Sequence, residues 1–365
     1  MLYKKSILFL TFLFALLGCE EEIPTLSDGS SEIRITAVWD SSYNSANKLI
    51  PAGNARIILV SEYGTIKAMT NSNGVLVLDN LPASNYIISV TMNHPVIDGI
   101  ILTGSGTGFT LNAQEIYSDT IQLKPTASSG LVINEIYFTG PVNSTFYIYD
   151  QYIELYNSSD SVKYLDGMMI MRFSGNGDEG QKGPGADENN DGDIDGVSNI
   201  YKFPGEPGEK NYGINPKSFA VLSVDAIDHS KIISSSLDLS KSDWEFYNQF
   251  SADDINNPEV PNLINLRPEV TVDFILNINS DIIAITKGND KNWSDGIDIN
   301  DIIDAVEYQP IYDLPKTLDE RLDRSFVISP AKYSGKSIQR REVGLDTNNG
   351  LFDWEIKQVP TVGFQ

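Results

Sequence analysis

The sequence is poor in the residues from which many enzyme active sites are built. Its 365 residues include one cysteine, Cys19, and two histidines, His94 and His229. Zinc sites and nucleophilic triads need such residues in clusters, and neither a histidine cluster nor a Gly-x-Ser-x-Gly motif occurs. A single cysteine also excludes a disulfide within the chain. We therefore expect a protein without enzymatic activity, which is stabilised by packed cores.

Basic residues are scarce as well. The chain has 26 Lys and Arg against 50 Asp and Glu, which gives a net charge of −24 and an isoelectric point near 4.3. A charge of this sign repels nucleic acids and anionic lipid surfaces, so neither is an expected partner. The length is sufficient for about two domains of ordinary size.

The only apolar run that suggests a membrane-directed segment lies at the N-terminus. It covers residues 7–17, follows Lys4 and Lys5, and ends in Leu-Leu-Gly-Cys at Cys19. The run is about half the length that spans a bilayer, which favours a removable signal peptide over residues 1–18. These features resemble a bacterial lipoprotein signal, whose cysteine receives a lipid and becomes the first mature residue. The resemblance implies lipidation of Cys19; an ordinary signal peptide with a chance cysteine is the alternative.

Three glutamates, Glu20 to Glu22, directly follow the cysteine and begin a polar tether over residues 19–30. A solvated charge run at a flexible end explains such residues without any function. The position is also similar to the export signal of Bacteroidetes surface lipoproteins. That resemblance implies an outer-membrane, lipid-anchored protein exposed at the cell surface, with the periplasmic face as the alternative.

Residues 31–124 have the pattern of a small β-sandwich. β-Branched and aromatic residues alternate with polar ones at 33–39 and 55–60, and two further strands are expected at 74–78 and 86–91. Asn-Gly and Asn-Leu-Pro turns lie between them. The Asn-Gly turn, the Asn-Leu-Pro turn and the tyrosine-containing strand that follows resemble the carboxypeptidase-regulatory or transthyretin-like family. This resemblance implies a spacer or a binding module.

A linker is expected at residues 125–130, and a second domain at 131–365. An ordered set of motifs in it resembles the lamin-tail domain, an immunoglobulin-like β-sandwich: Ile-Asn-Glu at 133–135, Ile-Glu-Leu-Tyr-Asn at 153–157, Leu-x-Gly at 165–167, Ile-Asp-Ala-Val at 303–306, Ser-x-x-Arg at 337–340 and Pro-Thr-x-Gly at 360–363. The predicted fold class is therefore all-β, with two sandwiches in tandem. The whole architecture resembles an uncharacterised family of Bacteroidetes lipoproteins.

Three long insertions interrupt the second domain, at about 174–217, 225–268 and 287–300. Loops of this length are usually functional and lie outside the core, so a partner is expected to contact them. Aromatic residues near these loops could form the contact surface, although packing in the core is the alternative for at least half of them. They are Phe146, Tyr147, Tyr149, Tyr152, Trp244, Phe246 and Tyr247.

Glu154 stands between two apolar residues of an expected strand. Side chains of a strand point alternately to its two faces, so this carboxylate is expected to be solvated or to bond a turn. A catalytic acid is the alternative, but no partner carboxylate lies at a spacing that supports it.

The first insertion contains a candidate calcium loop. Oxygen-bearing side chains alternate in it, with Gly192 at the sixth position, as in an EF-hand-like loop. The candidate ligands are Asp187, Asn189, Asp191, Asp193 and Asp195. Ser198 replaces the usual glutamate at the twelfth position, so the match is partial and a solvated acidic loop is the alternative. A weaker, irregular repeat of the pattern occurs at 290–298.

The sequence thus predicts a non-enzymatic surface lipoprotein that binds or accompanies a partner at the outer membrane. The family context implies a membrane barrel or a larger complex as this partner, with a TonB-dependent transporter as one candidate. A glycan-binding module or an adhesin is the rival hypothesis. A bound calcium ion would have a structural role.

Overall fold

A computed structural model describes residues 29–40, 49–95, 100–105, 108–127, 130–142, 146–173, 185–252 and 254–365. The predicted signal peptide and the lipidation site at Cys19 lie outside these residues. In the part of the chain that is described, no helix is long and apolar enough to cross a membrane. The prediction of an all-β protein is confirmed, since the only α-helix among these residues is α1, Gly350–Asp353.

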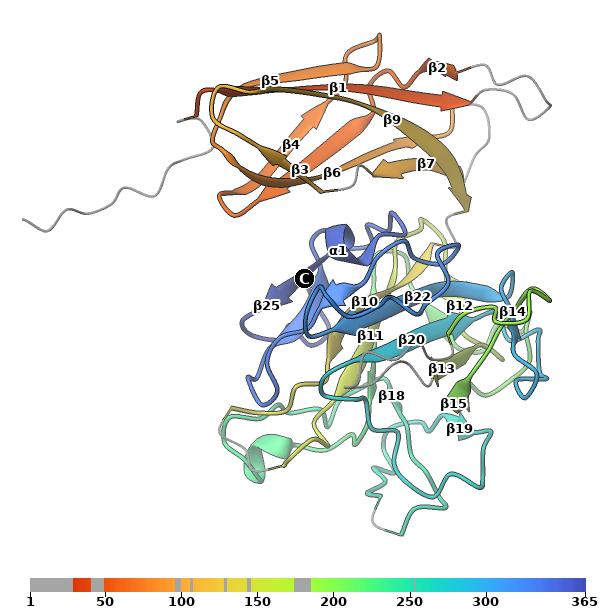
Figure 1. The fold of residues 1–365 in the computed structure, drawn as a ribbon. Helices are drawn as coiled ribbons and strands as arrows, with labels where there is room; N and C mark the ends of the chain where they lie inside the picture. Colours follow the sequence, from red (N-terminus) through yellow and green to blue (C-terminus); the bar gives the residue numbers. More distant parts are fainter. Residues whose placement is uncertain are drawn as a thin grey trace, which may run out of the picture.

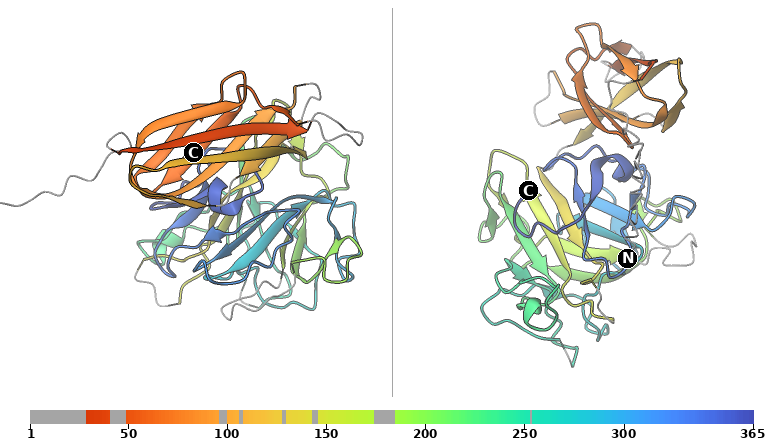
Figure 2. Two further views of the ribbon diagram at one scale, coloured as in Figure 1. Left: turned by 45° about the horizontal axis from the view of Figure 1, so that its top comes forward. Right: turned by 90° about the vertical axis from the view of Figure 1, so that its left-hand side faces the viewer.

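The first sandwich is a single sheet that curls around one core (Figures 1 and 2). Its order is β2-β1-β9-β7-β6-β3-β4, with β5 paired to β1 and β8 paired to β6. β1 and β9 run parallel, while the other pairs are antiparallel. The strands are β1 Ser31–Asp40, β2 Leu49–Pro51, β3 Arg56–Ser61, β4 Gly64–Met69, β5 Val75–Leu81, β6 Ser84–Asn93, β7 Ile100–Ser105, β8 Phe109–Leu111 and β9 Ile116–Ala127.

The second sandwich consists of two six-stranded sheets, ordered β18-β17-β11-β10-β24-β25 and β19-β15-β13-β20-β22-β23. Their strands are β10 Leu131–Tyr137, β11 Tyr152–Asn157, β13 Met169–Phe173, β15 Val197–Lys202, β17 Phe219–Ser223, β18 Trp244–Glu245, β19 Ile264–Asn265, β20 Asp281–Thr286, β22 Ile302–Gln309, β23 Val327–Ile328, β24 Ser337–Arg340 and β25 Trp354–Lys357. Two short pairs lie outside these sheets: β12 Lys163–Tyr164 with β16 Gly213–Ile214, and β14 Asp193–Ile194 with β21 Ile297–Asp298.

Apolar residues of both sheets share one core in this sandwich. The rings of Phe138 and Tyr308 stack with their centroids 4.0 Å apart, and those of Phe246 and Phe274 stack at the same distance. Removal of this apolar surface from water holds the two sheets together, at roughly 25 cal/mol per Å² buried.

Two sequence expectations about loops are wrong. The expected linker begins inside β9, which continues to Ala127, because a proline can stand in a strand where its missing N–H is not needed.

The insertions also supply parts of the core: β15 lies within 174–217, and Ile200 and Tyr201 in it are buried. Trp244 and Leu263 of the second insertion are buried as well. The strands inside these insertions are short and lie among glycines and acidic residues, so their hydrophobic periodicity is too weak for them to be recognised from the sequence.

The two sandwiches are joined by polar contacts. Glu342 of the second sandwich forms ion pairs with Arg56 of β3 and Lys67 of β4. The side chain of Asn349 donates a hydrogen bond to the Ser105 hydroxyl of β7 at 3.0 Å. Three groups of loops lie at the opposite end of the second sandwich, away from the first (Figure 1). We call this end the loop end.

Candidate binding surface at the loop end

Exposed apolar side chains gather at the loop end. Phe146 has 79% of its surface exposed and Ile232 has 58%, and Val142 and Tyr149, which lie within four residues of Phe146 in the sequence, are exposed as well. The turn that follows Ile232 is fixed to the first loop, since the Ser235 hydroxyl donates to the Val142 carbonyl at 2.9 Å. We call these four residues, together with Tyr333, the aromatic ledge.

The backbone beneath the ledge is strained. Phe146 has a φ of 66° and Tyr333 a φ of 55°, a region that costs residues other than glycine about 1–2 kcal/mol. Their rings meet edge to face with centroids 6.4 Å apart. A phenylalanine this exposed gains little from burial, so folding alone does not account for the arrangement. Strain of this kind is typical of functional surfaces.

Buried polar groups hold the ledge in place. The Tyr147 hydroxyl donates to His229 Nδ1 at 2.5 Å, and His229 Nε2 donates to the Asp225 carbonyl at 3.0 Å. Acceptance by Nδ1 requires the neutral imidazole, and burial lowers the pKa of His229, which favours that form. Asp150, whose pKa burial raises to about 6, accepts hydrogen bonds from Tyr137 and Ser236. The loops therefore present a preorganised surface.

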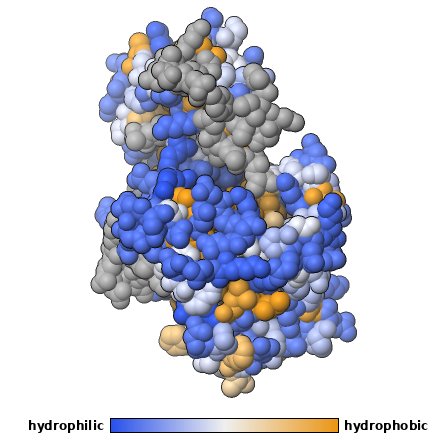
Figure 3. Space-filling view, turned by 90° about the vertical axis from the view of Figure 1, so that its right-hand side faces the viewer, coloured by the Kyte–Doolittle hydropathy of each residue, from blue (hydrophilic) through white to orange (hydrophobic). Residues whose placement is uncertain are grey.

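A second apolar area belongs to the insertion at 225–268 and the segment after it. Its exposed side chains are Phe250, Ile255, Ile264 and Val272. Figure 3 shows apolar side chains gathered on this part of the molecule. Buried Glu245 joins two parts of this insertion, because it accepts hydrogen bonds from the backbone N–H of Ala226 at 2.6 Å and of Asn257 at 2.9 Å.

The seven aromatic residues divide between core and surface, and Tyr147 and Tyr247 are partly buried. Tyr152, Trp244 and Phe246 are core residues, whereas Phe146 and Tyr149 are exposed. Ile232 and Tyr333 were not predicted as members of the ledge. No local pattern marks them, since their roles depend on the pairing of loops that lie far apart in the sequence.

The five candidate calcium ligands lie in a tight loop that opens into β14. Asp187 Oδ2 accepts a hydrogen bond from the backbone N–H of Gly192 at 3.2 Å. The side chain of Asn189 accepts one from the Asp191 N–H, and Asp191 accepts one from the Asp193 N–H, both at 3.0 Å. Asp195 accepts a hydrogen bond from the Glu188 N–H at 3.1 Å. The carboxylates of Asp187, Asp191 and Asp195 therefore accept hydrogen bonds from the backbone of their own loop.

The weaker acidic repeat lies beside this loop. β14 pairs with β21, which sets Asp193 opposite Asp298 and Ile194 opposite Ile297. Burial and the carboxylates of Asp191 and Asp290 raise the pKa of Asp193. Among the described residues, however, no three His, Cys, Asp or Glu side chains form a group that could hold a metal ion. Calcium binding therefore stays a prediction.

Arg321 supplies a positive charge at the acidic loop. Its Nη2 lies 2.8 Å from Asp187 Oδ2, and its Nε lies 2.9 Å from Asp319 Oδ1. The second oxygen of Asp187, Oδ1, is buried without a hydrogen-bond partner. A buried carboxylate oxygen without a partner is compatible with a cation site.

Glu154 is buried, contrary to the expectation of a solvated carboxylate. It accepts hydrogen bonds from Asn134 Nδ2 at 3.0 Å and from the Gly363 N–H at 2.7 Å, so the turn-bonding part of the expectation is confirmed. Glu135 stands opposite it on β10 and accepts from Thr361. Burial raises the pKa of Glu154 to about 8. The pair anchors a turn and faces none of the described cavities.

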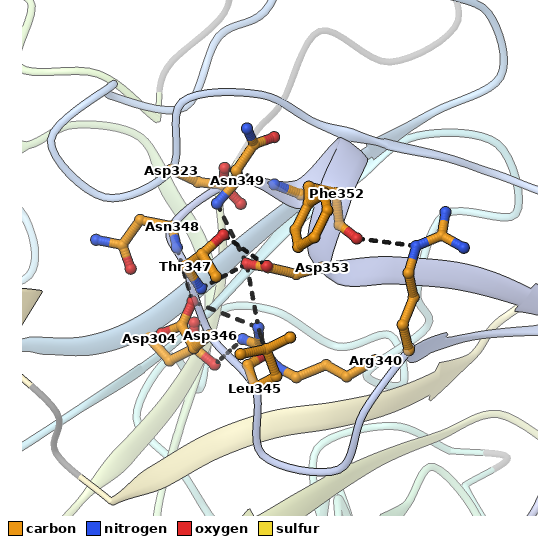
Figure 4. A network of polar contacts seen from close by, with 12 residues as sticks. Asp304, Asp323, Arg340, Leu345, Asp346, Thr347, Asn348, Asn349, Phe352 and Asp353 are labelled. Carbon is orange, nitrogen blue, oxygen red and sulfur yellow. Dashed lines mark hydrogen bonds and ion pairs between the residues drawn. The ribbon is translucent and has the colours of Figure 1, made fainter. Parts of the chain in front are cut away.

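A buried arginine, Arg340, lies beneath α1 and joins several elements of the second sandwich to one another (Figure 4). Arg340 Nη2 lies 2.8 Å from Asp304 Oδ2, and its Nη1 lies 3.4 Å from Asp346 and 3.6 Å from Asp353. Its Nε donates to the Ile133 carbonyl at 2.7 Å. One guanidinium thus joins β10, β22, β24 and the loop before α1.

Comparisons with known proteins bear on the fold. A family model described as a protein of unknown function (DUF4876) matches residues 215–301, less than half of the chain. The crystal structure of a DUF4876 family protein from Bacteroides thetaiotaomicron VPI-5482 is similar, with a TM-score of 0.55 at 18% identity over 89% of this chain and 94% of that chain.

The structure of a protein from Pseudomonas aeruginosa, provisionally assigned as carbohydrate binding, has a TM-score of 0.22 at 15% identity over 27% of this chain and 91% of that chain. No curated protein matches this sequence significantly. The chain therefore shares its fold with an uncharacterised protein of a Bacteroides species, while the transthyretin-like and lamin-tail resemblances stay predictions.

Proposed function

We propose that this chain is a non-enzymatic lipoprotein of the outer membrane, exposed at the cell surface, whose loop end binds a protein partner in the same membrane. The aromatic ledge carries this proposal. Exposed aromatic side chains on a fixed backbone are the usual anchors of protein interfaces. The first sandwich would act as the spacer between the lipidated Cys19 and the binding surface.

The ledge favours a protein over a glycan. Val142 and Ile232 are exposed beside its rings, and branched aliphatic side chains contribute contact area to a protein interface but offer no hydrogen bonds to a sugar. The acidic charge of the chain favours a partner whose contact surface carries basic residues around an apolar centre. We propose an outer-membrane barrel or its complex as this partner, in line with the resemblance to surface lipoproteins.

A pull-down from intact membranes tests the proposal. We expect a tagged chain to retain a stoichiometric membrane-protein partner, and a Phe146→Ala, Ile232→Ala double variant to lose about tenfold or more of it, since anchor residues cost at least 2 kcal/mol on truncation. Tyr312→Ala is the matched control, because this tyrosine is 65% exposed on another loop. Equal retention by both variants, or glycan binding without any partner, would contradict the proposal.

For the acidic loop we propose a structural calcium ion, which the oxygen-rich donor set and the orphaned Asp187 Oδ1 support. Millimolar Ca²⁺ should raise the melting temperature of the wild type by about 2–4 °C, the shift expected for roughly 1 kcal/mol of binding energy. Asp191→Asn should abolish the shift, whereas Asp160→Asn, at a carboxylate whose side chain is 95% exposed, should retain it. Identical midpoints with Ca²⁺ and with a chelator would remove the hypothesis.

A further inference from the structure

A groove of about 700 Å³ runs between the two sandwiches. Thr103 of β7 and Lys124 of β9, which are paired in register, form one wall. The opposite wall comes from the start of β22, the turn at 320–324 and the loop at 346–348. The volume lies within the range of about 300–1,000 Å³ that is typical of small-ligand sites.

The charges that line this groove are balanced, although the chain as a whole is strongly acidic. Lys124, Arg321 and Arg324 stand against Asp304, Glu320 and Asp346. A polyanion or a polycation would need an excess of the opposite charge, so the lining favours a neutral ligand. The first wall also offers no free strand edge to a peptide, because β7 and β9 each have partners on both sides.

The polar groups of the groove are fixed before any ligand arrives. Arg324 Nη2 donates to the Thr347 carbonyl at 2.8 Å and its Nε to the Asn348 carbonyl at 3.3 Å, which uses two of its five donors. Asp346 is held by Arg340, with 3.4 Å between Nη1 and Oδ1. The ion pairs of Glu342 with Arg56 and Lys67 join the two sandwiches outside the groove. Fixed groups lower the entropic cost of binding.

We infer that this groove is a binding site for a neutral oligosaccharide. Each sugar hydroxyl donates one hydrogen bond and accepts two, so a chain of them needs donors and acceptors side by side. Arg324, Asn348 and Asp346 supply both kinds within one loop cluster. Ile303 and Leu322 add apolar surface for the C–H faces of the rings. The site is independent of the aromatic ledge and of its protein partner.

Calorimetric titration with neutral hexasaccharides of glucose (α- and β-linked), xylose and mannose tests this inference on the full chain. At least one should bind with a dissociation constant on the order of 1 mM or below. Arg324→Ala and Lys124→Ala, one from each wall, should each weaken binding about three- to tenfold, the effect of one lost hydrogen bond. Raising the salt concentration should change the affinity little, since the ligand is uncharged.

Phe146→Ala is the matched control and should leave sugar binding unchanged, while the two groove variants should retain the protein partner in the pull-down. Binding of none of these sugars would overturn the inference. So would sugar binding that Phe146→Ala abolishes and both groove variants retain, because the sugar would then lie on the ledge. Thermal melts of each variant separate loss of a contact from loss of the fold.

Discussion

Replacing Arg340 with alanine is expected to lower the free energy of unfolding by about 3–5 kcal/mol, because truncating one partner of a buried ion-pair network leaves uncompensated charge. The substitution removes one buried guanidinium and leaves the carboxylates of Asp304 and Asp353 buried without their cation. It also leaves the carbonyls of Ile133 and Leu345 without their donor. Urea denaturation followed by circular dichroism measures the loss.

Two further variants make this result specific. Arg340→Lys keeps the charge but cannot reach all of these acceptors at once, so it should lie between alanine and the wild type. Lys231→Ala breaks an exposed ion pair with Asp228, with 3.1 Å between Nζ and Oδ2, and should change stability by less than about 0.5 kcal/mol. An Arg340→Ala chain as stable as the Lys231→Ala chain would show that the network contributes little.

The deficit of Arg340→Ala should shrink in acid. The pKa of Asp304 is raised to about 6 and that of Asp353 to about 7, in each case by burial. Near pH 5 both carboxyls are protonated in the variant, and a neutral acid is less costly to bury than a carboxylate. A deficit that is equally large at pH 5 and pH 8 would point to lost packing against Trp354, whose ring centre lies 5.0 Å from the guanidinium carbon.

The strands of this protein could be predicted where one or both faces are buried under β-branched residues. β1, β3 and β6 in the first sandwich have this pattern, and the sequence alone locates them. The sequence does not indicate β4 clearly, because its residues Gly64–Met69 are mostly exposed and the alternation of polar and apolar side chains covers only Thr65 to Ala68. The curl of the first sheet was not predictable either, since the parallel pairing of β1 with β9 joins strands far apart in the sequence.

In the candidate sites, too, some residues could be predicted from the sequence and others could not. Phe146 and Tyr149 could be proposed from composition, because aromatic residues in a long loop are conspicuous in any sequence. Tyr333 and the positive φ of Phe146 could not, since both depend on how two loops pack. Alternation along the strand predicts that Glu154 is solvated or bonds a turn, but it cannot identify the turn at Gly363, which covers the carboxylate. The groove was invisible for the same reason, as its walls come from both domains.

The fold should be most stable near pH 4 and should lose several kcal/mol between pH 4 and pH 9. Burial raises the pKa of Asp150 and Asp304 to about 6, of Asp353 to about 7, and of Glu154 and Asp323 to about 8. Each of these folded-state values lies above the value for an unfolded chain, near 4. The stability that each group contributes is therefore complete below pH 4 and is lost as the pH rises through the folded pKa.

Some other titratable groups make the fold less stable as the pH falls, but they do so only at lower pH. Ion pairs with Lys202 and Lys291 lower the pKa of exposed Glu206 to about 2, so its contribution is lost as the pH falls below 4. Burial lowers the pKa of His229, so this residue favours the unfolded chain below about pH 6.5. Its effect is smaller than the combined effect of the five buried carboxyls. The maximum should therefore lie on the acidic side of neutrality, where the buried carboxyls are already protonated.

Asp323→Asn isolates one of these groups. Asp323 Oδ1 accepts hydrogen bonds from the N–H of Gly350 at 2.8 Å and of Ser325 at 3.0 Å, and an asparagine oxygen can accept both. The amide never ionises, so this variant should match the wild type near pH 4 and exceed its stability at pH 9 by about 2–5 kcal/mol. Asp160→Asn, at an exposed carboxylate, should follow the wild type at both values. Urea denaturation at pH 4, 7 and 9 makes the comparison, and a pH dependence that Asp323→Asn leaves intact would show that this carboxyl is not a source of it.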